Sequence, residues 1–320
     1  MQYIMAAVLV LTGCSRAPKP NPGLPGPHIY LSGFTGNNAV YWIDHTMISL
    51  DLATNATGIT VVGKDVYVCG NRGFAYQGGG ADRACYWNNG TRVDMSDPPS
   101  YANGIAVSGN DIYVVGSALI NNDYVAVYWK NGTATPLSTV NNSLANGITI
   151  SGSDVYIAGF DGQGACYWKN GVKTMLENDP SANAWAVTID GSDVYVTGNI
   201  YTQWLHRKAA YWKNGSLTRL ETGKNDSMVV DTYANGIGVN GSDVHVSGWI
   251  NAYDAVYWKN GAMKRLYNPD TYVNIAHNTG NLFMFNHSPY ISLNSSDYWY
   301  NDTVRHVGNG YGTGIFVSGQ

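Results

Sequence analysis

The sequence predicts an all-β fold, a seven-bladed β-propeller built from four-stranded antiparallel blades. Three observations favour it: a Tyr-Trp dipeptide that recurs seven times, a composition rich in glycine and aromatic residues, and a repeat divided between the two chain ends. Among 320 residues, 38 are Gly, 24 are Tyr and 10 are Trp, whereas charged residues make up only 12%. Glycine marks turns and aromatic side chains favour half-buried pleated surfaces, so these frequencies indicate many short strands.

The Tyr-Trp dipeptide marks a repeat of about 40 residues, a period typical of solenoids, propellers and arrays. Helical solenoids need a 3.6-residue hydrophobic period, which is absent here, and parallel β-helices use much shorter repeats. Of the repeat architectures with this period, a closed β-propeller is therefore the one that fits the sequence. The seven copies begin at Tyr41, Tyr86, Tyr128, Tyr167, Tyr211, Tyr257 and Tyr298.

One copy of the repeat predicts four strands in order. The segment GITISG (147–152) alternates apolar and small residues and ends in a Gly-Ser-Asp turn, so it is the first strand. DVYIAG (154–159) is β-branched and aromatic, which favours a second strand, and ACYW (165–168) forms the third. The Asn-Gly that follows (170–171) is a strong hairpin signal, because a type I′ turn needs positive φ at both central residues. The fourth strand ends at Leu176.

The two chain ends carry the parts of one divided repeat. HIYLSG (28–33) corresponds to a second strand with no first strand before it, and TGIFVSGQ (313–320) is a first strand with nothing after it. The C-terminal strand is therefore expected to join the N-terminal blade and close the ring, which removes an exposed sheet edge. This predicts a single propeller domain over residues 28–320.

The order GI…DVYVxG…AxYWKNG…L over residues 28–320 resembles the extracellular repeats of bacterial proteins of the HAF type, in which a Gly-Ile strand precedes an aromatic-Trp-x-x-Gly hairpin. Those repeats carry Phe-x-Trp, whereas this chain has adjacent Tyr and Trp. More loosely, the chain resembles outer-membrane lipoproteins built as propellers, some of which are assembly scaffolds. The resemblance implies a location outside the cytoplasm and brings no general biochemical activity with it.

The N-terminus resembles a bacterial lipoprotein signal. The apolar run Ile4–Leu11 is too short to span a bilayer, and it leads into Leu11-Thr12-Gly13-Cys14. The resemblance implies cleavage before Cys14 and lipidation of this cysteine, although the first three residues lack the usual positive charge. We therefore expect residues 1–13 to be a signal peptide, residues 14–27 a proline-rich tether, and the protein to be lipid-anchored to the bacterial outer membrane. The alternative is an ordinary short apolar N-terminus.

The lengths of the connections predict which face of the propeller binds a ligand. Within a blade, the first-to-second and third-to-fourth turns lie on one face, and they are nearly uniform Gly-Ser-Asp and Asn-Gly turns. The other two connections lie on the opposite face and vary, from FTGNN (34–38) to NRGFAYQGGGADR (71–83). Variable loops on a rigid scaffold commonly carry binding residues. We call the second face the variable-loop face.

Aromatic and amide side chains on the variable-loop face are the candidates for ligand binding, since such platforms suit sugar rings or a peptide. An asparagine recurs at the start of the first strand in three copies, and a residue that recurs in this way usually serves the repeat itself. Trp185 replaces it in the fifth copy, so Trp185 and Trp204, which both break the repeat, are the stronger candidates. The predicted ligand-binding residues are Asn103, Asn146, Trp185, Tyr201, Trp204, Asn235 and Trp249.

Composition argues against several functions. A net charge of −4 without clustered Lys or Arg argues against nucleic-acid binding. The sequence contains no His/Cys spacing for zinc and no cofactor motif, so neither a metal nor a cofactor is expected. Three cysteines follow Cys14, and Cys69 and Cys85 either pair as a disulfide or stay buried as thiols like Cys166.

The favoured function is therefore a non-catalytic, monomeric envelope protein that binds a glycan or another envelope protein through its variable-loop face, with the membrane reached through the lipid anchor alone. One alternative is a carbohydrate-active hydrolase or lyase, because eight aspartates fall in the variable loops and glycoside hydrolysis needs two carboxylates at a defined separation. The other is a scaffold in envelope assembly.

Overall fold

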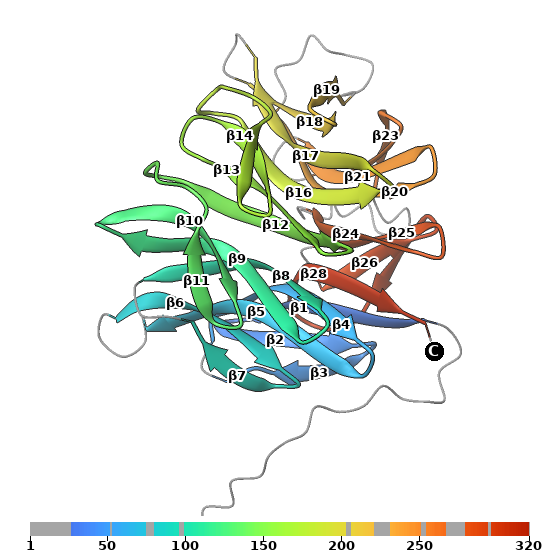
Figure 1. The fold of residues 1–320 in the computed structure, drawn as a ribbon. Helices are drawn as coiled ribbons and strands as arrows, with labels where there is room; N and C mark the ends of the chain where they lie inside the picture. The colour runs from blue at the N-terminus through green and yellow to red at the C-terminus, as the bar shows by residue number, and fades with distance from the viewer. Residues whose placement is uncertain are drawn as a thin grey trace, which may run out of the picture.

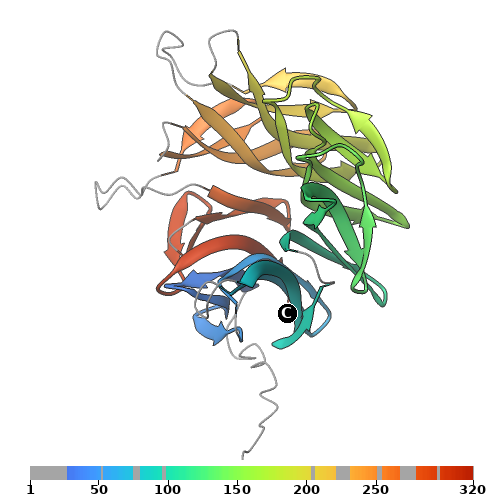
Figure 2. The same ribbon diagram turned by 90° about the vertical axis from the view of Figure 1, so that its left-hand side faces the viewer.

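The computed structural model describes residues 27–51, 53–74, 80–95, 99–202, 206–220, 231–250, 254–266, 279–293 and 296–319. These residues form seven four-stranded antiparallel sheets arranged as a β-propeller, which confirms the predicted fold (Figure 1 and Figure 2). No helix in the described part of the chain is long and apolar enough to cross a membrane. The predicted signal peptide and nearly all of the predicted tether lie outside the described residues, and so does Cys14.

Each blade takes its strands in chain order except the first, which begins with the last strand of the chain. Blades 1 to 3 contain β28 (Tyr311–Ser318), β1 (His28–Thr35), β2 (Asn38–Ile43) and β3 (Thr46–Ser49); β4 (Asn55–Val62), β5 (Asp65–Phe74), β6 (Gly80–Asn88) and β7 (Thr91–Asp94); β8 (Ser100–Ser108), β9 (Asp111–Ile120), β10 (Asp123–Lys130) and β11 (Thr133–Pro136). Blades 4 and 5 contain β12 (Leu144–Ser151), β13 (Asp154–Phe160), β14 (Ala165–Lys169) and β15 (Val172–Met175); β16 (Asn183–Asp190), β17 (Asp193–Tyr201), β18 (Arg207–Lys213) and β19 (Ser216–Arg219). Blades 6 and 7 contain β20 (Thr232–Asn240), β21 (Asp243–Ile250), β22 (Asp254–Lys259) and β23 (Ala262–Arg265); β24 (Thr279–Phe285), β25 (Ser288–Leu293), β26 (Asp297–Tyr300) and β27 (Thr303–His306).

The Tyr-Trp pairs join each blade to both of its neighbours. Adjacent residues of a strand point to opposite faces of the sheet, so the two rings enter different cores. In blade 4, Trp168 packs with Val115 of blade 3, whereas Tyr167 packs against the core that contains Trp212 of blade 5. The same division holds around the ring, and six of the seven Trp side chains are no more than 1% exposed. The recurrence of the pair is thus explained by inter-blade packing, as predicted.

In blades 3 to 6 a Lys-Asn-Gly turn follows each Tyr-Trp pair. These turns lie on the face opposite the variable-loop face, which we call the uniform face because its turns are nearly the same in every blade. In blade 4, Asn170 has φ 50° and accepts a hydrogen bond from the backbone N–H of Val155 at 2.9 Å. Its amide donates to the Asp154 carboxylate at 2.7 Å, and the Lys169 ammonium pairs with the other carboxylate oxygen at 2.8 Å. Hydrogen bonds from Lys169 and Asn170 lower the pKa of Asp154. The uniform turns therefore serve the hairpin.

The ring closes between the two ends of the chain, as the divided repeat predicts. Strand β28 pairs with β1, with Leu31 opposite Ile315, and Ile315 and Val317 are 4% and 2% exposed. The hydroxyls of Ser32 and Thr313 share a hydrogen bond of 3.1 Å. In both ribbon views the end of the chain, drawn in red, lies beside its blue beginning (Figure 1 and Figure 2).

The three cysteines in the described part of the chain, Cys69, Cys85 and Cys166, are buried free thiols, which decides between the two alternatives left by the sequence. Cys69 packs in the core between blades 2 and 3, whereas Cys85 packs in the core between blades 1 and 2. The sheet of blade 2 separates them, because Cys69 lies opposite Tyr86 and Cys85 lies opposite Gly70 in the register of β5 and β6. Burial raises the pKa of Cys69 to about 12, so this thiol stays protonated.

Candidate functional site

A β-bulge in the innermost strand of every blade turns one side chain toward the mouth of the central channel. In blade 3, Ala102 pairs with Gly116 and Gly104 with Val115, which leaves Asn103 between them without a partner in the ladder. A bulge inserts an extra residue in this way and re-aims its side chain. The residues at this position are Thr313, Thr57, Asn103, Asn146, Trp185 and Asn235 in blades 1 to 6, and Gly280 with Asn281 in blade 7.

In blades 1 to 6, the glycine that ends the DVYVxG motif makes room for this bulge, whereas blade 7 has Leu293 at this position and a bulge of two residues. A Cβ on Gly116 would lie 1.8 Å from the carbonyl oxygen of Tyr101, and one on Gly248 would lie 1.9 Å from that of Tyr233. Both carbonyls stand two residues before the bulge. No side chain fits at this separation, so the recurring glycine of DVYVxG is required by the backbone of the adjacent strand.

Most bulge residues link their blade to the next one. Asn103 donates from its amide to the carbonyl of Ala145 at 2.9 Å, and Asn146 donates to the carbonyl of Ala184 at 2.8 Å. The hydroxyls of Thr313 and Thr57 donate to the carbonyls of Ala56 and Ala102 at 2.6 and 2.8 Å. The recurring asparagines thus serve the repeat in blades 3 and 4. We call these hydrogen bonds the bulge ladder.

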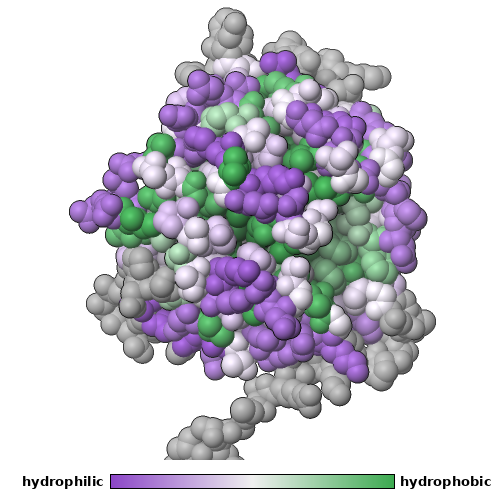
Figure 3. Space-filling view, in the orientation of Figure 1, coloured by the Kyte–Doolittle hydropathy of each residue, from purple (hydrophilic) through white to green (hydrophobic). Residues whose placement is uncertain are grey.

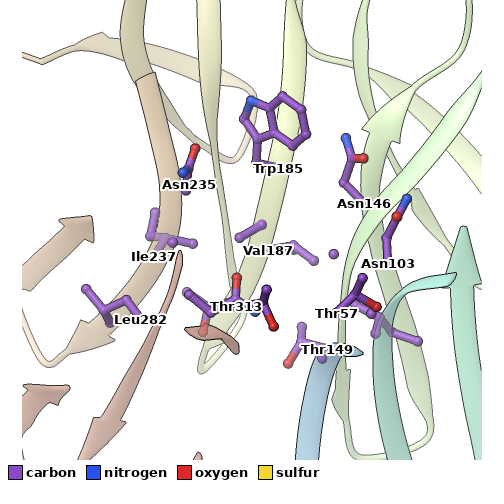
Figure 4. A pocket seen from close by; sticks show the side chains of 18 of the residues that line it. Thr57, Asn103, Asn146, Thr149, Trp185, Val187, Asn235, Ile237, Leu282 and Thr313 are labelled. Atoms are coloured by element: carbon purple, nitrogen blue, oxygen red, sulfur yellow. The ribbon is translucent and has the colours of Figure 1, made fainter. Parts of the chain in front are cut away.

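Trp185 interrupts the bulge ladder. Its indole N–H donates to Asn199 Oδ1 at 2.8 Å, and Asn199 belongs to β17 of the same blade. The indole itself is half-buried and lines the cavity between the positions of Asn146 and Asn235 (Figure 4). With its single donor satisfied inside blade 5, the ring presents apolar surface to the channel.

The cavity runs along the axis of the propeller and has a volume of about 1310 Å³. The innermost strands of all seven blades contribute to its wall, which includes aliphatic side chains such as Val187, Ile237 and Leu282 (Figure 4). Phe283 and Phe316 lie against each other in the wall, with ring centroids 4.6 Å apart. From outside, hydrophilic side chains are spread over the surface and hydrophobic ones gather in a hollow at its right (Figure 3). The volume exceeds that of a typical small-molecule pocket.

Aromatic rings and one arginine gather on the cavity rim where blades 5 and 6 meet. Tyr233 and Trp249 stack with ring centroids 3.6 Å apart and an interplanar angle of 16°. The Arg207 guanidinium lies 5.3 Å from the ring centroids of both Tyr201 and Tyr233, and it donates to the Tyr233 hydroxyl. We call Trp185, Arg207, Tyr233 and Trp249 the blade 5–6 rim. All four line the cavity.

The structure brings five of the seven predicted site residues to one cavity. The asparagines at 103, 146 and 235, together with Trp185 and Trp249, line its wall. Tyr201 is not among the residues that line the cavity, but its ring contacts Arg207, which does line it. Trp204 lies outside the described residues. The binding role of these residues stays a prediction.

The loop 199–208 stands out in the sequence and contains Arg207, but neither Arg207 nor the bulge threonines are among the predicted ligand-binding residues, and all of them line the wall. Thr57 and Thr313 occupy the asparagine position of the Ala/Gly-x-Gly-Ile pattern, so an alignment of the copies on that pattern finds them. Arg207 stands four residues before Tyr211. The same position holds Asp82 and Tyr124 in blades 2 and 3, so a single basic residue there is a weak signal.

Several loop aspartates have structural roles. Asp161 is fully buried and accepts hydrogen bonds from the Gln163 backbone and from Lys173, while Asp254 pairs with Arg265 at 2.6 Å. Among the described residues that line the cavity there is no Asp or Glu, and no group of three metal-ligating side chains occurs in the described ranges. Asp97, Asp226 and Asp270 lie outside those ranges.

The fold and the cavity define the class of this protein: a seven-bladed β-propeller with a wide axial cavity and one distinctive blade junction. No family model matches the chain, and no curated protein matches it in sequence. Among solved structures it is similar to the computationally designed protein Ika8, with 16% identity, 90% of each chain covered and a TM-score of 0.48. It is also similar to YCF48 bound to a D1 peptide, with 12% identity, 94% and 97% coverage and a TM-score of 0.48. YCF48 from Cyanidioschyzon merolae is also similar, with 10% identity, 84% of this chain and 94% of that chain covered, and a TM-score of 0.46. These similarities add no function to the fold.

Proposed function

We propose that this protein is a non-catalytic, lipid-anchored propeller of the bacterial cell envelope that binds a glycan at the blade 5–6 rim. The observation that carries the proposal is that aromatic and basic side chains converge there. Trp185 replaces the bulge asparagine, Arg207 and Trp249 both contact Tyr233, and all four residues line one cavity. No other described stretch of the cavity wall combines two indoles with an arginine.

The chemistry of the rim suits a saccharide. A sugar ring has apolar faces of C–H groups and an edge of hydroxyls, so it needs a flat aromatic surface next to hydrogen-bonding groups. Trp185 and the stacked Tyr233–Trp249 pair supply the surface. Asn183 and Asn235 also line the cavity and add amide groups to its wall. Aromatic side chains give large contact area at low entropic cost.

The cellular location in this proposal comes from the sequence. Cys14 follows a lipoprotein-like signal, and the proline-rich segment after it would hold the propeller away from the membrane as a semi-extended spacer. A stable anchor needs more than one acyl chain, which bacterial lipoprotein processing would supply.

A glycan array on the full-length protein, with neutral and charged saccharides, tests the proposal. The strongest hit is then titrated into wild type, Trp249→Ala and Lys130→Ala. Loss of an aromatic hot spot costs about 2 kcal/mol or more, so Trp249→Ala should weaken binding about thirtyfold. Lys130 pairs with Asp111 on the uniform face and is the matched control, which should bind as wild type. An array without hits, or a loss confined to Lys130→Ala, would show the proposal to be wrong.

A further inference from the structure

Arg207 is the single charged side chain among the described residues that line the cavity. Every other described residue of the wall is apolar, a glycine, or carries a hydroxyl or an amide. A lone cation in a wall that is partly shielded from water attracts an anion more strongly than the same group on an open surface. Such a cation at the cavity mouth would favour an anionic ligand over a neutral ligand of the same shape.

The guanidinium is fixed in place and keeps free donors. Tyr201 and Tyr233 each hold it by a cation–π contact, and one of its N–H groups donates to the Tyr233 hydroxyl. Oδ1 of the nearby Asp231 accepts the backbone N–H of Arg207 at 2.9 Å and lies 3.3 Å from His206 Nδ1, so this oxygen is engaged away from the guanidinium, although the carboxylate still attracts the arginine through space. An arginine has five N–H donors in a planar fork, so most remain for a ligand.

We propose that the glycan bound at the blade 5–6 rim is acidic, with a sugar carboxylate held by the fork of Arg207. This inference rests on the proposed function and names the ligand class of the same site. A planar carboxylate accepts two parallel hydrogen bonds from a guanidinium, which gives orientation as well as affinity. Trp249 stacks on Tyr233, which in turn contacts Arg207, and Trp185 lines the same cavity from the blade of Arg207. A sugar ring held at this rim would therefore bring a carboxylate on its edge toward the guanidinium.

Uronate oligosaccharides and their methyl esters test the charge directly. Each ester keeps the sugar backbone and loses the negative charge, so the pair isolates the contribution of the carboxylate. We expect the free acids to bind full-length protein about tenfold or more tightly than their esters, since a hydrogen bond to a charged group is worth about 1.5–3 kcal/mol. Added NaCl should reduce the difference in affinity between acids and esters, because salt partly screens a half-buried ion pair.

Two arginine variants assign the effect to a residue. Arg207→Gln should bind acid and ester alike, and Arg207→Lys should keep part of the preference because it retains the charge without the fork. Arg219→Gln is the matched control, since Arg219 is exposed on the outer strand β19 of the same blade. Tyr233→Phe removes the hydroxyl that accepts a hydrogen bond from Arg207 and so tests how the guanidinium is positioned. This variant should lose more affinity for the acids than for the esters. The ester comparison on wild type keeps the inference testable even if an arginine variant fails to fold.

The outcomes separate the inference from the proposed function. Equal binding of acids and esters, or a preference that survives Arg207→Gln, would overturn the acidic class and leave glycan binding in place. Binding only to sulfated sugars, or only to a polyglutamate peptide, would overturn the carboxylated-sugar ligand. Failure of every neutral and acidic saccharide to bind would overturn both the proposed function and this inference.

Discussion

The indole N–H of Trp185 donates to Asn199 Oδ1 at 2.8 Å within blade 5, at the position where Asn103 and Asn146 donate to the following blade. One residue thus exchanges an inter-blade contact for apolar surface in the cavity. Stability and ligand binding are therefore expected to diverge at this position, because the repeat favours asparagine and the proposed ligand favours tryptophan.

Trp185→Asn should separate the two roles. Compared with Trp185→Ala, the asparagine can donate to blade 6 and should raise the free energy of unfolding by about 1 kcal/mol. Both variants should lose most of the glycan affinity, because neither has an aromatic ring. Chemical denaturation and titration calorimetry on the three proteins measure this. Wild-type affinity in Trp185→Asn would show that the indole does not contact the ligand.

Asn146→Ala should weaken the bulge ladder. Asn146 is 9% exposed, and its amide donates to the Ala184 carbonyl at 2.8 Å and to the Asn183 side chain at 2.9 Å. Removing it leaves buried acceptors without a partner, so the free energy of unfolding should fall by about 1–3 kcal/mol. Denaturant unfolding measures the change. Thr133→Ala, on the exposed outer strand β11, is the control and should change stability by less than about 0.5 kcal/mol. Equal stability of both variants would contradict the role of the ladder.

Loss of the last strand should open the ring. Deleting residues 313–320 removes the packing of Ile315 and Val317, each worth about 1.5–3 kcal/mol, and exposes the edge of β1. We expect aggregation or a much lower melting temperature, measured by light scattering and calorimetry. Deletion of the last two residues, 319–320, spares β28 and is the control. A truncated protein that melts like wild type would mean that the ring does not depend on this strand.

Replacing His245 should make the protein less sensitive to acid. His245 stands where other copies of the repeat have tyrosine, and its Nδ1 lies 2.6 Å from the Tyr257 hydroxyl. Burial lowers its pKa, Lys259 lowers it further and Asp243 opposes them. Below about pH 6.5 the unfolded chain binds a proton that the folded chain does not, so stability falls as pH drops from there to the folded pKa.

His245→Tyr removes this linkage while it restores the usual residue of the repeat. Its melting temperature should fall less steeply than that of wild type between pH 7 and pH 5. His287→Asn is the control, because His287 is exposed and should leave the wild-type slope unchanged. Identical slopes for wild type and His245→Tyr would assign the acid sensitivity to other groups.

Cys14→Ala should release the protein from membranes. In a host that processes lipoproteins, wild type should fractionate with membranes and the variant should not, because lipidation requires the thiol. Ser15→Ala keeps the thiol and is the control. Membrane fractionation followed by mass spectrometry of the N-terminal peptide measures the effect. Equal membrane retention of Cys14→Ala and wild type would contradict the lipid anchor.

The repeat makes the fold predictable from the sequence. The site is less predictable, because it depends on which residues pair across neighbouring strands. Asn103 and Asn146 were visible because they recur, and Trp185 was visible because it breaks the recurrence. Arg207 lies at the end of a connection of variable length, and its place on the rim depends on the pairing of Tyr201 with Arg207 and on contact with Tyr233 of the next blade. Neither follows from an alignment of the copies. The cysteine question was open for the same reason, since the register of β5 and β6 places Cys69 and Cys85 on opposite faces.

The first blade to leave the ribosome is the last one that can be completed. Ser32 and Thr313 share a hydrogen bond across 281 positions of the chain. Contacts at such separation raise the contact order and slow folding, because a long loop must close before they form. During synthesis from the N-terminus, blade 1 therefore lacks its fourth strand until the final residues arrive. We expect a dependence on chaperones during this interval, and early degradation of chains that terminate before Thr313.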